Sequence, residues 1–366
     1  MSPLPLTKLA SPALLFKESS IDYNLDLMVE LAGDSSRLRP HVKTHKCPNI
    51  IARHIQRGIT KFKCATIAEA EMVAKNGATS LILAKQPVGP DIARIIELAV
   101  HFPDTEVLAI VDNEGSIIQL AQALSASTVR LGLLADVDCG MARTGIAPGP
   151  ALYELYSKLV SEPRIEASGF HVYDGHIHDA DLATRRSRSA QALANVLATK
   201  RELEKQQRPV PRLVAGGSPT FVIHAANPAV TECSPGTTVL WDTGYQDAYP
   251  DLPFKPAAFV MTRVISRLSE DAVCVDLGHK AISADKPQPR VRFDRLPEAV
   301  LETHSEEHLV IRSPHCQDLE IGEALIGIPQ HICPTVALYD HASILNEHDE
   351  VIDRWPIEAR TRQLTI

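Results

Sequence analysis

The stretch KFKCATIAEAEMVAKNGATSLILAK, residues 61–85, decides the predicted fold. It opens with a short β-rich run, Lys61–Thr66, and continues into Ile67–Asn76, where apolar residues recur at the spacing of one helix face. Gly77 follows as a favourable helix C-cap, and Ser80–Lys85 is a second strand-like run. A strand, a helix and a strand in this order predict a right-handed βαβ unit with parallel strands.

The same alternation extends over the first two-thirds of the chain. Segments with helical periodicity lie between the β-rich runs, including Asp91–His101, Asn113–Leu124 and the long Asp179–Gln207. An open doubly wound sheet usually has about five to seven strands, so eight strand–helix units favour an α/β fold of the (β/α)8 TIM-barrel type. The candidate strands are Leu38–Thr44, Lys61–Thr66, Ser80–Lys85, Glu106–Val111, Val129–Asp136, Glu166–Tyr173, Arg212–Ala215 and Ala229–Cys233.

The character of the sequence changes near residue 240. Turns rich in Pro, Gly and Asp replace the helical segments, which predicts a C-terminal antiparallel β domain. Ala10–Phe16 is a further strand candidate for this domain. We therefore expect an N-terminal segment, 1–20, that joins the β domain, then the barrel, 21–240, and the β domain, 241–366. The strand-like runs after the barrel are Val260–Leu268, Ala272–Leu277, Val291–Phe293, His308–Arg312 and Glu323–Ile328.

The composition excludes several classes of protein. The 366 residues carry a formal net charge of −8, which argues against a general nucleic-acid binder because such proteins show a basic surplus. The longest apolar runs fall far short of the ~20 residues that a membrane-spanning helix needs, and the N-terminus lacks a signal-peptide pattern. The seven cysteines are scattered and odd in number, which is typical of reducing surroundings. We expect a cytoplasmic protein with no nucleic-acid or membrane partner.

A lysine ends the first candidate strand, in RPHVKTHK at 39–46. Side chains alternate along a strand, so His41, Lys43 and His45 would share one face and point into the barrel mouth, where chemistry takes place in this fold. Burial and neighbouring imidazoles would lower the pKa of Lys43 and free its amine to form a Schiff base. The alternative is a lysine that extends into solvent at the end of a strand.

Two small glycine loops follow the seventh and eighth candidate strands, AGGSPT at 215–220 and CSPGTT at 233–238. These are the usual phosphate-binding loops of the barrel, because glycines let backbone amides approach an anion. Each loop taken alone is also compatible with an ordinary turn. Together with Lys43 they point to a phosphate-bearing aldehyde, pyridoxal 5'-phosphate. The candidate contacts are Gly217, Ser218, Thr220, Gly236 and Thr237.

Two further motifs are candidates for chemistry. DCGMARTG at 138–145 follows the fifth strand, and its glycines could hold Arg143 against an acceptor, although a surface arginine is the simpler interpretation. In HICPT, His331 and Cys333 are two residues apart, which on an extended segment places imidazole and thiolate on one side. This donor pair suits Zn²⁺, although His-x-Cys pairs also occur by chance.

Taken together, these motifs resemble fold type III pyridoxal-phosphate enzymes, in which the barrel is of the alanine racemase type. The chain is similar to the D-threonine aldolase and D-serine dehydratase branch over almost its full length. The resemblance makes Lys43 the Schiff-base lysine, with His41 beside it, and places Arg143 near the cofactor's phenolic oxygen. FHVYDGHIHD at 170–179 makes Tyr173 the partner of the pyridine nitrogen, and HICPTVALYDH at 331–341 with DRWPIEAR at 353–360 matches the metal signature.

The resemblance implies a lyase that acts on D-β-hydroxy-amino acids with pyridoxal 5'-phosphate and a divalent metal, Zn, Mn or Mg, on His331 and Cys333. The favoured reaction is a retro-aldol cleavage to glycine and an aldehyde. The alternative is dehydration of D-serine or D-threo-3-hydroxyaspartate to a 2-oxo acid and ammonia, because residue 333 is Cys where aldolases of the branch often carry Asp. Remoter alternatives are a non-catalytic cofactor-binding protein and a sugar-phosphate barrel enzyme. The resemblance also implies a homodimer.

Overall fold

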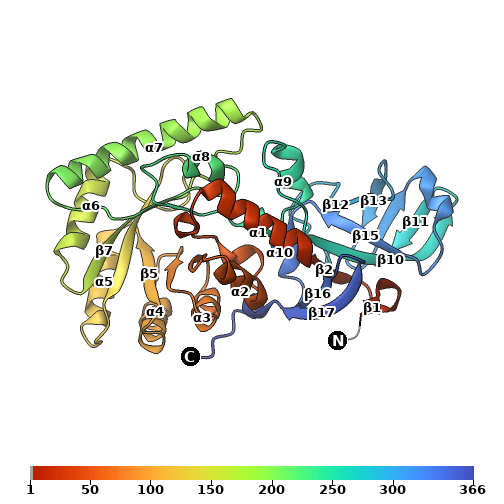
Figure 1. The fold of residues 1–366 in the computed structure, drawn as a ribbon, viewed down its shortest axis with the longest axis horizontal. Coiled ribbons are helices and arrows are strands. Elements are labelled where there is room, and N and C mark those ends of the chain that lie inside the picture. Colours follow the sequence, from red (N-terminus) through yellow and green to blue (C-terminus); the bar gives the residue numbers. More distant parts are fainter. Residues whose placement is uncertain (1–2) are drawn as a thin grey trace. The chain divides into compact units, whose positions relative to one another are not determined.

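The structure, a computed structural model, describes residues 3–366. Its contacts divide the chain into two units (Figure 1), which are described separately. The barrel unit comprises Met28–Lys43, Ile51–Gly236 and Thr361–Ile366. The β unit comprises the chain up to Leu27, the short segment Thr44–Ile50, and Thr237–Arg360.

The barrel unit is built on a sheet of seven parallel strands in sequential order. The segment before the first strand closes this sheet, because Leu38 bridges Cys233 of the last strand and His41 bridges Lys63 of the first, both in parallel. Eight segments thus form a ring, which confirms the predicted (β/α)8 barrel. The strands are β3 (Lys61–Cys64), β4 (Ser80–Leu83), β5 (Glu106–Val111), β6 (Leu131–Val137), β7 (Ile165–Val172), β8 (Leu213–Ala215) and β9 (Glu232–Cys233).

Helices alternate with these strands, as the periodicity of the sequence predicts. Local capping sets several of their N-termini: Thr66 accepts from the amide of Glu69, and Asn113 from that of Ser116. The long α7 is one of the predicted helices, α1 and α8 follow segments after which a helix is expected, and α2 and α6 were not predicted. The helices are α1 (Glu18–Ala32), α2 (Pro48–Gln56), α3 (Ile67–Lys75), α4 (Pro90–His101), α5 (Glu114–Leu124), α6 (Pro150–Ser161), α7 (Leu182–Lys205) and α8 (Phe221–Ala225).

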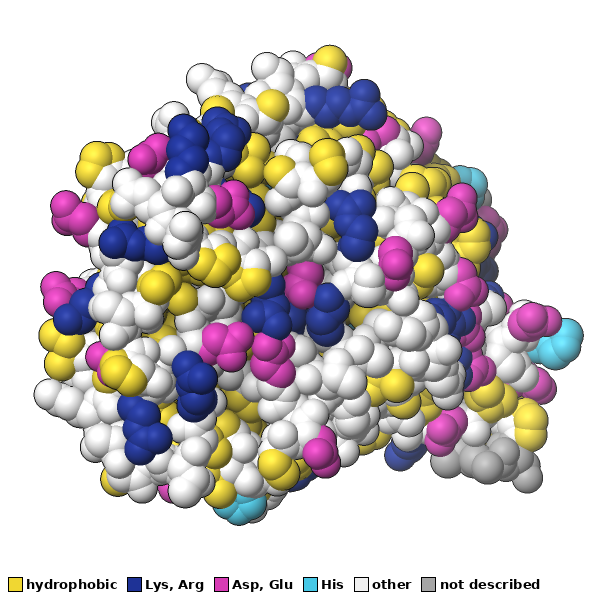
Figure 2. All heavy atoms as spheres, turned by 60° about the vertical axis from the view of Figure 1, so that its left-hand side comes forward, with side chains coloured by type: hydrophobic (Ala, Val, Ile, Leu, Met, Phe, Trp, Pro, Cys, Tyr) yellow, Lys and Arg dark blue, Asp and Glu magenta, His cyan; other side chains and the backbone are white. Residues whose placement is uncertain are grey.

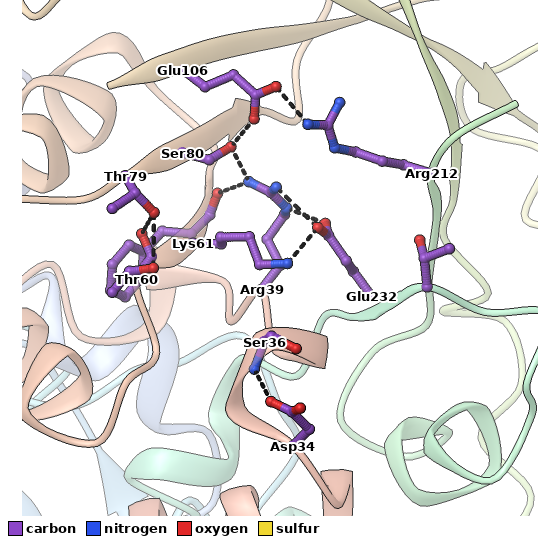
Figure 3. Close-up of polar contacts among 12 residues, drawn as sticks. Asp34, Ser36, Arg39, Thr60, Lys61, Thr79, Ser80, Glu106, Arg212 and Glu232 are labelled. Atoms are coloured by element: carbon purple, nitrogen blue, oxygen red, sulfur yellow. Dashed lines mark hydrogen bonds and ion pairs between the residues drawn. The ribbon is translucent and has the colours of Figure 1, made fainter. Parts of the chain in front are cut away.

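A polar network fills the end of the barrel where the strands begin (Figure 3). The fully buried Arg39 donates from Nε to Glu232 at 2.5 Å, and Glu232 also accepts from Lys61 at 2.7 Å. Arg39 further donates to the hydroxyl of Ser80 at 3.1 Å, which in turn donates to Glu106 at 2.7 Å. Because barrel chemistry occurs at the other, C-terminal ends of the strands, this network has a structural role.

We expect Arg39→Met to lower the free energy of unfolding by about 3–5 kcal/mol, because it leaves Glu232 buried without its arginine partner. The control is Arg94→Met, which removes an exposed pair with Glu97 and should cost no more than about 1 kcal/mol. Urea unfolding monitored by circular dichroism measures both variants. Equal destabilisation of the two would contradict a structural role for the network.

The β unit holds a ten-stranded, mostly antiparallel sheet, as predicted for the C-terminal region. The N-terminal β2 lies inside this sheet, antiparallel to β10 and parallel to β16. Strands β1, β13, β16 and β17 were not predicted as strands. The elements are β1 (Leu4–Pro5), β2 (Ala13–Lys17), α9 (Thr243–Ala248), β10 (Ala258–Ser269), β11 (Ala272–Val275), β12 (Val291–Phe293), β13 (Val300–His304), β14 (Leu309–Arg312), β15 (Ala324–Pro329), α10 (Ile332–Val336), β16 (His341–Leu345) and β17 (Glu350–Pro356).

The β unit has a hydrophobic core of its own, to which several of its strands contribute. Val260 and Val264 of β10 pack with Val273 of β11, Ile311 of β14 and Leu325 of β15, and all five are almost fully buried. Within residues 3–366, no helix has the length and apolar character that a membrane span requires. Lys and Arg side chains are interspersed with Asp and Glu over the face drawn in Figure 2.

Candidate active site

The lysine motif does not continue the first barrel segment as a strand, so the predicted strand Leu38–Thr44 is too long. Val42–Thr44 is instead a turn of 3₁₀ helix, and the imidazole Nδ1 of His41 accepts from the amide of Lys43 at 3.3 Å. His41 and His45 are buried, whereas Lys43 is exposed. The shared strand face and the burial of Lys43, both predicted, are therefore wrong, and the turn is what exposes the amine.

One cavity of the barrel unit gathers the predicted cofactor residues His41, Lys43, Arg143 and Tyr173. They converge because each lies at or just beyond the C-terminal end of a barrel segment, although the segments are far apart in the sequence. Three further residues that were not singled out from the sequence complete the lining: Lys63, Ala84 and His171.

Three cationic side chains lie close to the ring of Tyr173. Arg143 lies 4.8 Å from the ring centroid, Lys63 Nζ 5.6 Å and Lys43 Nζ 5.9 Å, distances at which the electron-rich face of a ring attracts positive charge. A Cβ atom at Gly175 would lie 2.4 Å from the ring atoms, so only glycine leaves room for Tyr173 there. The pocket is consequently cationic and suited to an anionic ligand.

His171 lines the same cavity, and a hydrogen bond to Asp136 fixes its imidazole. Its Nδ1 is 2.7 Å from a carboxylate oxygen of Asp136, and Thr144 donates to the other oxygen at 2.8 Å. Burial lowers the pKa of His171, against the opposing effect of Asp136, so the ring is neutral near pH 7. Its Nε2 is buried and has no hydrogen-bond partner within residues 3–366, which leaves a polar atom available to a ligand.

The two glycine loops meet in the barrel unit, as predicted. The amide of Gly236 donates to the hydroxyl of Ser218 at 3.2 Å, and the amide of Gly217 donates to that of Thr220 at 3.3 Å. Thr220 also donates to Asp174 at 2.9 Å. The helix that follows, α8, has only five residues, so its dipole adds little and loop amides would do most of the anion binding. Whether these loops hold phosphate stays a prediction.

His331 and Cys333 lie in the β unit, but not on an extended segment as predicted. Ile332–Val336 forms α10, with His331 as its N-cap residue and Cys333 in its first turn. The thiol lies 3.2 Å from the hydroxyl of Thr44 and 3.5 Å from that of Thr237. Thr237, predicted to bind the cofactor, therefore contacts the thiol of the predicted metal pair.

Residues at the start of α9 form hydrogen bonds with the backbone on either side of His331. Asp242 accepts from the amide of Ile332 at 3.0 Å, and the amide of Gly244 donates to the carbonyl of Gln330 at 3.2 Å. A Cβ atom at Gly244 would lie 2.6 Å from that carbonyl oxygen, so a side chain there would displace the loop. Burial raises the pKa of Asp242 to about 6, and its two backbone donors oppose that rise.

The side chains of the pair interact with each other, and His331 also contacts Asp285. Nδ1 of His331 is 2.7 Å from a carboxylate oxygen of Asp285, which leaves Nε2 for a second partner. Burial would raise the pKa of the Cys333 thiol, but hydrogen bonding with His331 and the charge of that imidazole hold it below its usual value. Against the effect of burial, Cys333 and Asp285 raise the pKa of His331 to about 9.

Both implied groups fit the residues present. The cationic cavity with an exposed amine and an unpartnered Nε2 suits an anionic aldehyde cofactor. The pair of a carboxylate-oriented imidazole and a thiol of lowered pKa suits a divalent ion. Within residues 3–366, no group of three or more His, Cys, Asp or Glu side chains lies close enough together to hold a metal ion.

Comparison with known protein families identifies the family to which the barrel segment is similar. The family model "Alanine racemase, N-terminal domain" matches residues 17–243. The chain belongs to this family. A second model, "Putative serine dehydratase domain", matches residues 257–345, so both parts of the predicted resemblance are confirmed. The family uses pyridoxal 5'-phosphate, and the relatives of this chain are lyases.

The likeness extends over the full length of relatives with known activity. D-threonine aldolase of Arthrobacter sp is 26% identical over 361 residues, which cover 97% of this chain and 94% of that protein. D-threo-3-hydroxyaspartate dehydratase of Delftia sp. is 23% identical, with 91% and 93% covered. The crystal structure of D-threonine aldolase from Filomicrobium marinum superposes with a TM-score of 0.92 at 26% identity, covering 99% of both chains. These relatives catalyse different reactions, so likeness alone does not fix the reaction.

Proposed function

We propose that this protein is a pyridoxal-phosphate- and divalent-metal-dependent lyase that cleaves D-β-hydroxy-amino acids to glycine and an aldehyde. One contact carries the proposal: the thiol of Cys333 lies 3.2 Å from the hydroxyl of Thr44. Because Thr44 follows Lys43 directly in the chain, this contact supports a role for the lysine motif and the His–Cys pair in one reaction. A protein that only carried the cofactor would have no use for the pair.

The barrel residues bind and orient the cofactor in this proposal. Lys43 would offer its exposed amine to the aldehyde, and Tyr173 and Arg143, which line the same cavity, would contact the cofactor ring. The loops at Gly217 and Gly236 offer amides to the phosphate. When bound, the cofactor withdraws electrons from the α-carbon of the amino acid. Lys43 is the residue that holds or releases a proton at that carbon.

His331 and Cys333 would hold the metal, with the imidazole and the thiolate as its protein ligands. When bound, the ion lowers the pKa of the substrate's β-hydroxyl as a Lewis acid. Asp285 keeps the imidazole in the tautomer and orientation that leave Nε2 available. Two protein ligands leave open positions on the ion, as a catalytic rather than a structural site requires.

The second candidate is a dehydratase that releases ammonia and a 2-oxo acid. The thiolate at residue 333 favours it, because a thiolate donates more charge to the ion than a carboxylate and makes it a weaker acid toward the hydroxyl. The match of residues 257–345 to a serine dehydratase domain also supports it.

Product analysis decides between the two reactions. The protein, loaded with pyridoxal 5'-phosphate and Mn²⁺ or Zn²⁺, is incubated with D-threonine, D-serine and D-threo-3-hydroxyaspartate. Glycine with an aldehyde is the expected result, and a 2-oxo acid with ammonia would establish the dehydratase. Absence of both products with all substrates would overturn the proposed lyase.

We expect Asp285→Asn to weaken metal affinity by about 10–100-fold, because the amide no longer fixes the imidazole of His331 by charge. The apparent dissociation constant of the metal is obtained by titrating the metal-free protein with the ion and measuring activity at each concentration. The matched control is Asp318→Asn, an exposed aspartate of the same unit, which should leave that constant unchanged. An Asp285→Asn protein with wild-type metal affinity would show that Asp285 does not act on the ion.

A further inference from the structure

Lys63 is a second lysine of the cofactor cavity. It lies near the C-terminal end of β3, its side chain is 3% exposed, and it lines the cavity together with Lys43 and Arg143. Its backbone is fixed, because its amide donates to the carbonyl of Pro40 at 2.9 Å and it bridges His41. The side chain therefore enters the cavity from a rigid part of the barrel.

The amine of Lys63 has no counter-charge of its own. The two carboxylates whose charges act on this amine already have other partners: Asp136 has His171 and Thr144, and Asp174 has Thr220 and His224 at 2.9 and 2.7 Å. No residue within 3–366 forms an ion pair or a hydrogen bond with Nζ of Lys63. Burial, and then the charge of Lys43, lower its pKa to about 7, while Asp174 and Asp136 oppose this and Arg143 adds to it.

A buried, unpaired amine is unfavourable for folding, because its desolvation is not compensated. A lysine with a purely structural role would have a carboxylate beside it, as Lys61 has in Glu232 at 2.7 Å on the same strand. Lys63 instead lines a cavity whose lining also includes His171, the buried Nε2 of which has no hydrogen-bond partner within residues 3–366. A ligand in this cavity is the remaining source of a partner.

The chemistry of that partner follows from the cofactor. The phenolic oxygen of pyridoxal phosphate is attached to the ring carbon next to the one that bears the aldehyde. Lys43, which takes the aldehyde, and Lys63 both lie within 6 Å of the centroid of the Tyr173 ring, at 5.9 and 5.6 Å. We propose that Lys63 is a cofactor-binding residue that supplies positive charge to the phenolic oxygen alongside Arg143. This rests on the proposed use of pyridoxal phosphate by this chain.

The test is a spectrophotometric pH titration of the nitrogen that links Lys43 to the cofactor, in Lys63→Met and wild-type holoprotein. A cation beside the phenolate disfavours a further proton on that nitrogen, so its removal should raise the titration midpoint by roughly one pH unit. We also expect cofactor affinity to fall by about tenfold, measured by fluorescence titration. Lys63→Arg, which keeps the charge, should return the midpoint most of the way to the wild-type value.

Lys61→Met is the matched control, because it removes the same charge from the same strand at the other end of the barrel, and its midpoint should stay at the wild-type value. The apoprotein of Lys63→Met should unfold at or above the wild-type temperature, since an unpaired buried amine is lost. If Lys63→Met does not fold, the titration midpoint and the cofactor affinity are measured on Lys63→Gln instead. An unchanged midpoint and affinity in a folded Lys63 variant would overturn the inference. A wild-type protein that forms no covalent link with the cofactor would overturn the proposed function instead.

Discussion

Lys43→Ala is expected to abolish the covalent link with pyridoxal phosphate and to lower turnover by at least about 10³-fold, the range seen when a nucleophile is removed. The amine is exposed at the end of a 3₁₀ turn and lines the cavity, so no other change in the structure is required for it to reach the aldehyde. Borohydride, which reduces the linkage to a stable secondary amine, should label wild-type protein at Lys43 and leave the variant unlabelled.

Two substitutions separate this chemistry from a loss of charge. Lys43→Arg keeps the cation but cannot form the link, and it should be as inactive as Lys43→Ala. Lys46→Asn serves as the control within the same motif, because residue 46 has a positive φ of 50°, which asparagine tolerates. It should retain the label. Peptide mapping that placed the label on Lys63 instead would show that the buried lysine, and not Lys43, holds the cofactor.

The barrel and much of its cofactor cavity could be predicted from sequence because both follow from local patterns. Periodicity identifies strands and helices, and the ends of parallel strands must meet at one end of a barrel. Arg143 and Tyr173 converge with Lys43 for this reason, although they are distant in sequence. These cavity residues could be predicted from one fact alone, that each motif directly follows a predicted strand.

The residues that were missed depend on tertiary pairing. Lys63 reads in sequence as an ordinary strand residue, and only closure of the barrel shows that it is buried without a carboxylate. The sequence places His171 on a strand, but does not show that Asp136 of the neighbouring strand contacts its imidazole. Asp285 comes from a loop with no motif of its own. The turn at Val42–Thr44 and the start of α10 were misjudged because short segments between prolines and strands carry little periodic signal.

Removal of the second ligand is the other change with a large expected effect. Cys333→Ser should lower bound metal and turnover by about 100-fold or more, while the covalent link at Lys43 persists. Serine is close in size and can keep hydrogen bonds with Thr44 and Thr237, so the fold of α10 should be preserved. Metal content by atomic emission and the cofactor absorbance band, measured on one sample, separate the two sites.

Cys274→Ser is the matched control, a half-buried cysteine of the same unit on β11 whose thiol donates a hydrogen bond to the carbonyl of Val275. It should retain both metal and activity. Cys333→Asp carries the argument further, because a carboxylate restores a ligand and makes the ion a stronger acid. Under the proposed aldolase reaction, this variant should regain metal and keep glycine and aldehyde as its products. If product analysis establishes the dehydratase for the wild-type protein, the variant should instead shift products toward glycine and aldehyde. Full activity of Cys333→Ser after chelation would show that the reaction proceeds without metal.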